Sequence, residues 1–202
     1  MCDTSPTSTY RDEVIRKTIH VASVLCPLIY AFIDRELMLW LATPLALAFI
    51  AADILRQVHP SLRGFYDRRF GQLMRRDENQ RLCGASHVMI AVVLCVWLFP
   101  KQVAIAAMLF MSVSDALASL VGQWVGGPRW FNASLSGSSA FLLSALLIAL
   151  PLLWGHPLAA VCGALTATVV EALPLRVGQA RIDDNISVPL SGGLVMWLLY
   201  TP

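Results

Sequence analysis

Seven long apolar stretches follow one another along the chain, and they constrain its fold more than any other feature. A helix of about 20 apolar residues spans the roughly 30 Å hydrocarbon core of a bilayer. Only 14% of the 202 residues are charged, against about 25% in an ordinary soluble domain. We therefore expect one membrane-embedded domain over residues 1–202, an all-α polytopic bundle of about seven transmembrane helices at 14–33, 37–55, 83–99, 102–124, 136–154, 157–174 and 186–201.

Positive charge is distributed unevenly between the two sides of such a bundle. Cytoplasmic loops of membrane proteins carry an excess of Lys and Arg. If the N-terminus is cytoplasmic, thirteen of the 15 Lys and Arg residues lie inside, and only Arg35 and Lys101 lie outside. The sequence therefore predicts a cytoplasmic N-terminus. Short termini and compact loops favour a bacterial inner membrane.

The longest connection, residues 56–82, combines seven arginines with aromatic and apolar residues at helical spacing. This pattern is typical of an amphipathic helix on an anionic leaflet. We predict such a segment on the cytoplasmic face at about 57–80. A nucleic-acid interface has a similar composition, but the membrane already accounts for the charge, so we expect no nucleic-acid partner.

One carboxylate, Asp115, stands inside the apolar stretch 102–124. A charged residue at the centre of a transmembrane helix costs about 2.5–3.5 kcal/mol on an insertion scale. Ser119, Gly122 and Gly126 share its helix face, and we expect this face to look into the bundle. Close helix packing is the simplest interpretation of the two glycines. Packing does not account for the carboxylate, because a cation, a metal ion or a basic side chain must offset its charge.

More oxygen ligands are expected on the same side of the membrane. Glu171 lies near the inner end of the sixth stretch, and Asp183, Asp184 and Asn185 precede the seventh. Magnesium is usually bound by one or two carboxylates together with substrate phosphates and water. We therefore predict a metal site formed by Asp115, Glu171, Asp183 and Asp184. Helix capping is the alternative for the two adjacent aspartates.

A loop rich in glycine and serine, residues 126–140, connects the fourth and fifth stretches. Backbone N–H groups in such a loop suit a phosphate group, and Arg129 suits pairing with it. His20 and His87 are further candidates for a base or a ligand, although hydrogen bonding in the interior is the favoured interpretation of both. The sequence therefore predicts a phosphate site at this loop, and the family resemblance described below extends it to a set of nucleotide-binding residues: Gly122, Gly126, Arg129, Ser134, Gly137, Ser138 and Asn185.

Five segments carry a resemblance to a known family. In "SDALASLVGQWVGGPRW" (114–130) an aspartate is followed by glycines seven and eleven residues later. "SLSGSSAF" (134–141) and "VEALPLRVGQARIDDNISVPL" (170–190) match two further patterns, and "IRKTIHVAS" (15–23) and "RRFGQLMRRDE" (68–78) match the family's first span and its arginine/glutamate loop. The sequence resembles the polyprenol kinase family, which includes dolichol kinase, phytol kinase and the CTP-dependent diacylglycerol kinase of yeast.

The resemblance implies a polytopic enzyme that moves the gamma-phosphate of CTP onto a membrane lipid alcohol, with Mg²⁺ or Ca²⁺. It places Asp115, Gly122 and Gly126 in the CTP-binding segment, and Gly137 and Ser138 at the end of the phosphate loop. Asp115, Glu171 and Asp184 become the expected catalytic acids, with Asn185 beside them. Lys17, His20, Arg75 and Glu78 become further candidates through the first span and the arginine/glutamate loop.

The sequence departs from the family pattern at one place. Where the family usually has lysine, this chain has Ala133, and Ser136 replaces an acidic residue. Lysine is a natural partner of a transferred phosphate. Either Arg129 or another arginine takes over that role, or the activity is weaker.

Three functions are therefore weighed. The leading hypothesis is a CTP-dependent kinase for a polyprenol, a phytol-like isoprenoid alcohol or a diacylglycerol, acting at the cytoplasmic face. The alternative is a phosphatidate cytidylyltransferase, although that family's Lys-Arg, Lys-Asp and His-Gly-Gly residues are missing here. The third is a lipid-binding protein without catalysis, or a transporter. A transporter needs polar residues through both halves of the membrane, whereas these gather in one.

Overall fold

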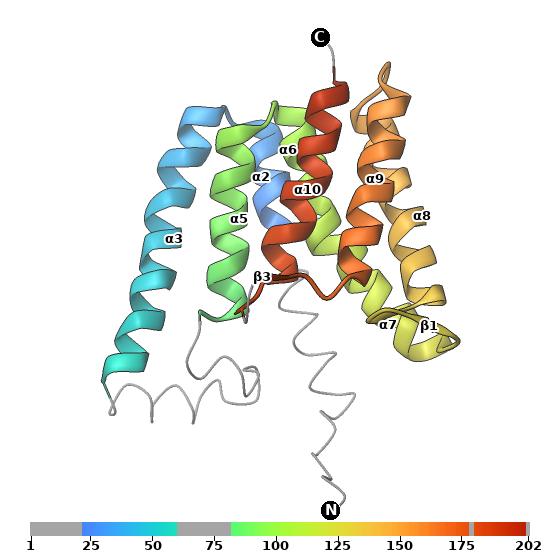
Figure 1. Cartoon of the computed structure of the whole chain (residues 1–202). Helices are drawn as coiled ribbons and strands as arrows, with labels where there is room; N and C mark the ends of the chain where they lie inside the picture. Colours follow the sequence, from blue (N-terminus) through green and yellow to red (C-terminus); the bar gives the residue numbers. More distant parts are fainter. Residues whose placement is uncertain (1–21, 60–81, 178–179, 201–202) are drawn as a thin grey trace, which may run out of the picture.

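The computed structural model describes residues 22–59, 82–177 and 180–200. These ranges form a helical bundle with two short β-hairpins at one end (Figure 1). In chain order the elements are α2 (Leu25–Phe32), α3 (Arg35–Val58), α5 (Gly84–Leu98), α6 (Lys101–Leu109), η2 (Phe110–Ser114), α7 (Asp115–Val125), β1 (Arg129–Trp130), β2 (Ala133–Ser134), α8 (Leu135–Leu152), α9 (Pro157–Ala172), β3 (Arg176–Val177), β4 (Ala180–Arg181) and α10 (Asp184–Leu199).

All seven predicted apolar stretches contain a helix in the described ranges. The sections α6, η2 and α7 join into one helix, Lys101–Val125, which matches the predicted stretch 102–124. Of the first stretch, 14–33, residues 14–21 lie outside the described residues, as do residues 60–80 of the predicted amphipathic segment. The all-α fold is confirmed for the described part of the chain.

Three of these helices are long and apolar enough to cross a membrane: Arg35–Val58, Lys101–Val125 and Leu135–Leu152. Gly84–Leu98 and Pro157–Ala172 are shorter apolar helices. The chain is therefore an integral membrane protein. Seven membrane crossings and the cytoplasmic N-terminus remain predictions.

Large apolar side chains cover the outside of the bundle, while small residues fill much of its interior. Phe32 and Trp154 are each 89% exposed and Trp40 is 78% exposed. Alanines such as Ala107 and Ala164 are fully buried. Small interior residues let helix backbones approach closely, which is how helices associate in lipid, where apolar burial gives little driving force.

The helices stand side by side, with α3 at one edge of the bundle and α8 at the other (Figure 1). α3 packs on α5, α10 packs on both α5 and α9, and α8 packs on α9 and α7. The ends of α7 and α9 and the beginnings of α8 and α10 lie at the end of the bundle that carries both hairpins, opposite to the C-terminus.

A π-helical turn, η2, separates α6 from α7 and ends directly before Asp115. One extra residue in a helix turn shifts the register of all following side chains by about 100°. The face that carries Asp115 is therefore set by this turn as well as by the spacing along α7. Such turns are frequent at functional sites, and the sequence did not predict this one.

The backbones of α7 and α8 touch at Gly122 and Gly137. A Cβ added to Gly122 would lie 2.7 Å from the Ser134 Oγ and 3.4 Å from the Gly137 Cα. A Cβ added to Gly137 would lie 2.8 Å from the carbonyl oxygen of Ala118. Close packing therefore accounts for Gly122. Packing does not account for Gly126, because a Cβ added there would meet no atom within 4 Å. Gly126 instead ends α7 with a φ of +66°, a conformation that favours glycine.

We expect Gly137→Ala to separate α7 from α8, because its new methyl group would meet a backbone carbonyl that cannot rotate away. Overpacking of this kind costs about 1–3 kcal/mol, so the thermal unfolding midpoint of the detergent-solubilised protein should fall. Ser139→Ala, an exposed position in the same helix turn, is the matched control. Equal midpoints for the two variants would contradict the tight contact.

Candidate functional site

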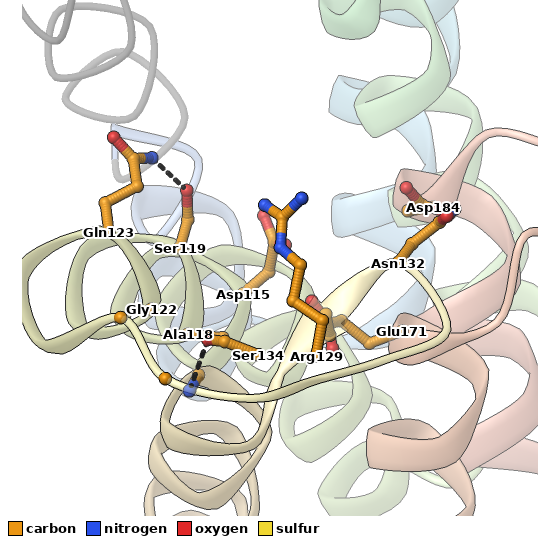
Figure 2. A pocket seen from close by; sticks show the side chains of 14 residues that line it. Asp115, Ala118, Ser119, Gly122, Gln123, Arg129, Asn132, Ser134, Glu171 and Asp184 are labelled. Atoms are coloured by element: carbon orange, nitrogen blue, oxygen red, sulfur yellow. Dashed lines mark hydrogen bonds between the residues drawn. The ribbon is translucent and has the colours of Figure 1, made fainter.

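A polar cavity of about 560 Å³ opens at the hairpin end of the bundle. Its walls come from α7, the β1–β2 hairpin, the first turn of α8, the last turn of α9 and the start of α10 (Figure 2). The residues that line it are Asp115, Ala118, Ser119, Gly122, Gln123, Gly126, Gly127, Arg129, Asn132, Ala133, Ser134, Gly137, Glu171 and Asp184.

Three carboxylates from three different helices line this cavity. Asp115 is the first residue of α7, Glu171 lies in the last turn of α9, and Asp184 is the first residue of α10. All three are half-buried. The structure thus brings together the three predicted catalytic acids. Like charges around one cavity raise each other's energy unless a cation shares the space.

The donor set fits a metal ion that arrives with a phosphate ligand. In the described ranges, no group of three or more His, Cys, Asp or Glu side chains is arranged to hold a metal ion. Magnesium, however, is commonly held by only one or two carboxylates, with phosphate and water oxygens as its other ligands. The cavity suits that mode of binding better than a cage made by protein alone.

Asp183 is not among the cavity-lining residues, although we predicted it as a metal ligand. It is the N-cap of α10, and its Oδ1 accepts a hydrogen bond of 3.0 Å from the backbone N–H of Asn185. The capping alternative therefore describes Asp183. Its Oδ2 lies 3.7 Å from the Nδ1 of His87, which is also 3.1 Å from the carbonyl oxygen of Cys83. His87 and Asn185 likewise lie outside the cavity lining.

The glycine- and serine-rich loop folds as a tight hairpin. Arg129 pairs with Ser134 and Trp130 pairs with Ala133, and Phe131 at the turn has a φ of 50°. A positive φ is uncommon for a bulky residue, so the surrounding contacts hold this turn in place.

Several backbone N–H groups of this loop already have partners inside the protein. Those of Asn132 and Leu135 donate to the carbonyl oxygens of Ala172 and Pro128, and that of Gly137 donates to the Ser134 Oγ. The predicted phosphate cradle of backbone amides is thus smaller than the sequence suggested. The hairpin instead presents side chains to the cavity, above all Arg129 and Ser134.

Ser138, predicted to bind nucleotide, attaches the hairpin to α8 instead of lining the cavity. Its side chain is 5% exposed, and its Oγ accepts a hydrogen bond of 2.9 Å from the indole Nε1 of Trp130. This bond places β1, and therefore Arg129, against the start of α8.

Among the described residues, Arg129 is the one basic residue that lines the cavity. In Figure 2 its side chain rises from the hairpin between Asp115 on one side and Asp184 on the other. Ala133, which replaces the family's lysine, also lines the cavity. A lysine at this position would therefore add a second positive charge to the same space.

Of the lining residues, the sequence did not single out Gln123, Gly127 and Asn132, and it identified Ala118 only as a small residue of the family pattern. Gln123 could have been found from its helical spacing, because it lies one turn beyond Ser119 and donates a hydrogen bond of 3.1 Å to the Ser119 Oγ. Asn132 had no such signal, since only folding brings its loop to the end of α9. The candidates Lys17, His20, Arg75 and Glu78 lie outside the described residues.

Comparison with known proteins gave relatives among curated sequences, whereas no protein-family model and no solved structure matched. The uncharacterized protein RP860 of Rickettsia prowazekii is 32% identical over 89% of this chain and 90% of its own length. A "Probable phytol kinase, chloroplastic" of Triticum aestivum is 33% identical over 56% of this chain and 42% of the kinase.

The CTP-dependent diacylglycerol kinase 1 of Schizosaccharomyces pombe is 35% identical over 43% of this chain and 41% of the kinase. The chain thus spans about half or less of the length of the kinases that it matches.

Fold and cavity together define an integral membrane protein with a polar, acidic site at one end of a helical bundle. The chain is a distant homologue of phytol kinases and of a CTP-dependent diacylglycerol kinase, which are proteins of the polyprenol kinase family.

Proposed function

We propose that this protein is a CTP-dependent lipid kinase that transfers the gamma-phosphate of CTP to the hydroxyl of a membrane lipid alcohol at the cytoplasmic face. The acceptor is a polyprenol, a phytol-like isoprenoid alcohol or a diacylglycerol. The main support is that three carboxylates and Arg129, from parts of the chain far apart in sequence, line one cavity in a homologue of such kinases.

The cavity's size and polarity suit the nucleotide and the reacting hydroxyl. Small-molecule sites typically enclose about 300–1,000 Å³, and this one has about 560 Å³. An apolar tail has no favourable partners in an acidic, polar lining. The tail of the acceptor therefore remains in the bilayer, beside the exposed apolar helix faces, and only its head group enters.

Each charged side chain has a role in phosphoryl transfer. Arg129 pairs with phosphate oxygens of CTP and neutralises charge that develops during the reaction. Asp115 or Asp184 orients the lipid hydroxyl and accepts its proton as its oxygen bonds to the gamma-phosphorus. The bond between that phosphorus and the bridging oxygen breaks, and CDP leaves. Asp115, Glu171 and Asp184 would hold Mg²⁺, which screens the negative charge of the phosphates.

Labelled CTP tests this function directly. The purified protein in lipid vesicles receives Mg²⁺ and CTP that carries radioactive phosphorus at either the alpha or the gamma position. Polyprenol, phytol, diacylglycerol and phosphatidate are offered in turn. We expect gamma label in one of the alcohols. Alpha label in the lipid would instead establish a cytidylyltransferase, and no metal-dependent transfer to any acceptor would refute both enzymatic proposals.

Asp115→Asn and Asp184→Asn should each lower the rate of transfer by about a hundredfold or more, since general-base and electrostatic contributions are of that size. Both variants keep the volume of the side chain, so folding should be preserved. Asp34→Asn is the matched control, because Asp34 is an exposed aspartate that caps α3 at the opposite end of the bundle. Full activity of either cavity variant would remove that carboxylate from the reaction.

Arg129→Gln should lower kcat/KM for CTP by about a hundredfold, as expected for loss of a charge that stabilises the transition state. Adding Ala133→Lys to this variant should restore part of the activity, because position 133 lines the same cavity. Arg35→Gln provides the control, because Arg35 is an exposed arginine at the start of α3, at the end of the bundle opposite to the cavity. If kcat/KM is unchanged in Arg129→Gln, another cation carries this role.

A further inference from the structure

A buried carboxylate outside the cavity, Asp53 of α3, joins two helices of the bundle. Its side chain is 2% exposed, and hydrogen-bond donors lie close to both of its oxygens. The Oδ1 accepts from the Arg56 Nε at 2.8 Å. The Oδ2 accepts from the backbone N–H of Cys83 at 2.8 Å and from the Ser86 Oγ at 2.6 Å. Asp53 thus acts as a cap for the start of α5 from a neighbouring helix.

The same end of α5 contacts the start of α10. Cys83 is the N-cap of α5, and its carbonyl oxygen lies 3.1 Å from the Nδ1 of His87. That nitrogen also lies 3.7 Å from the Oδ2 of Asp183, the N-cap of α10. Because two acceptors face Nδ1, the hydrogen-bond network assigns a proton to it.

Apolar packing supports the same connection. Ile186, in the first turn of α10, packs against a small cluster formed by Val88 and Ala91 of α5 and Met111 of η2. Met111 lies one helix turn before Asp115, and Ile186 lies two residues after Asp184. The cluster therefore joins α5 to the two helices that carry Asp115 and Asp184.

We propose that Asp53, Ser86 and His87 are positioning residues that hold the first turn of α10, and with it Asp184, at the cavity. Asp53 holds the start of α5 through Cys83 and Ser86. His87, in the first turn of α5, then lies against Asp183, the N-cap of α10. Asp184 is the next residue in the chain. None of the three residues lines the cavity, so they act through the helices. Their importance for transfer rests on the function proposed above, whereas the mechanical link does not.

Ser86→Ala tests the link with the smallest change, because it removes one hydroxyl and leaves the carboxylate with its other partners. Hydrogen exchange of the full-length protein in lipid nanodiscs, read by mass spectrometry, reports on the backbone amides of Asn185, Ile186 and Ser187, which all bond to Asp183. We expect exchange in this turn to accelerate by about tenfold, the effect of losing a hydrogen bond to a charged group.

Ser144→Ala is the matched control. Ser144 is also a buried serine, at 8% exposure, but its Oγ bonds only to carbonyl oxygens of its own helix, α8. Exchange in the first turn of α10 should stay unchanged in this variant.

His87→Ala and Asp53→Asn test the two ends of the chain of contacts. His87→Ala should accelerate the same amides without changing exchange at the start of α5. Asparagine at position 53 cannot accept hydrogen bonds from both Arg56 and Ser86, because one of its two terminal atoms is an NH₂ group, which is itself a donor. If Asp53→Asn does not fold, Ser86→Ala and His87→Ala still decide the question.

Metal dependence separates positioning from general stability. In Ser86→Ala and His87→Ala the Mg²⁺ concentration for half-maximal transfer should rise by about tenfold, the size of effect seen when a partner that orients a metal ligand is lost. Ser86→Ala should also lower the melting temperature, but hydrogen exchange in α2, α8 and α9 should match that of Ser144→Ala.

Two results would overturn the proposal. One is unchanged exchange in the first turn of α10 in both Ser86→Ala and His87→Ala. The other is acceleration spread equally over α2, α8 and α9, since it would mark a general loss of stability. Absence of phosphate transfer by the unmodified protein would instead refute the proposed function, and the exchange measurements would still decide the mechanical link.

Discussion

The close approach of α7 and α8 at Gly122 and Gly137 is the contact on which the site depends. It brings the last turns of α7 against the first turn of α8 with almost no side chain between them. The connection between the two helices must then turn back within a few residues, and Gly126, at positive φ, allows that turn. The hairpin that results carries Arg129 to the edge of the cavity.

The site follows a general rule for helices in lipid. Charged side chains are costly in hydrocarbon unless they face the interior or a polar cavity. Here Asp115, Glu171 and Asp184 come from three helices and meet in one cavity at one end of the bundle. The large apolar residues lie on the outer faces instead. The same arrangement would place the lipid acceptor proposed above in contact with both environments.

Ala133 shows how the position of a missing residue can be informative. Sequence comparison with the family pattern identified the absence of a lysine, but not its consequence. The structure places Ala133 in the cavity lining and Arg129 in the same hairpin. A guanidinium group on this hairpin can therefore supply positive charge to the space that a lysine would have reached.

By itself the sequence predicted the seven helical stretches, the three acidic residues that line the cavity and the homology to lipid kinases, because apolar length, helical spacing and short motifs are local properties. The capping role of Asp183 was one of two sequence-based alternatives, and only the structure chose between them, through its bond to the N–H of Asn185. Four features could not be predicted: the π-turn before Asp115, the internal partners of the loop amides, the hydrogen bond from Trp130 to Ser138 and the Asp53 network. The Asp53 network and the bond from the Asn132 N–H to Ala172 join segments distant in the chain, and only tertiary packing selects such contacts.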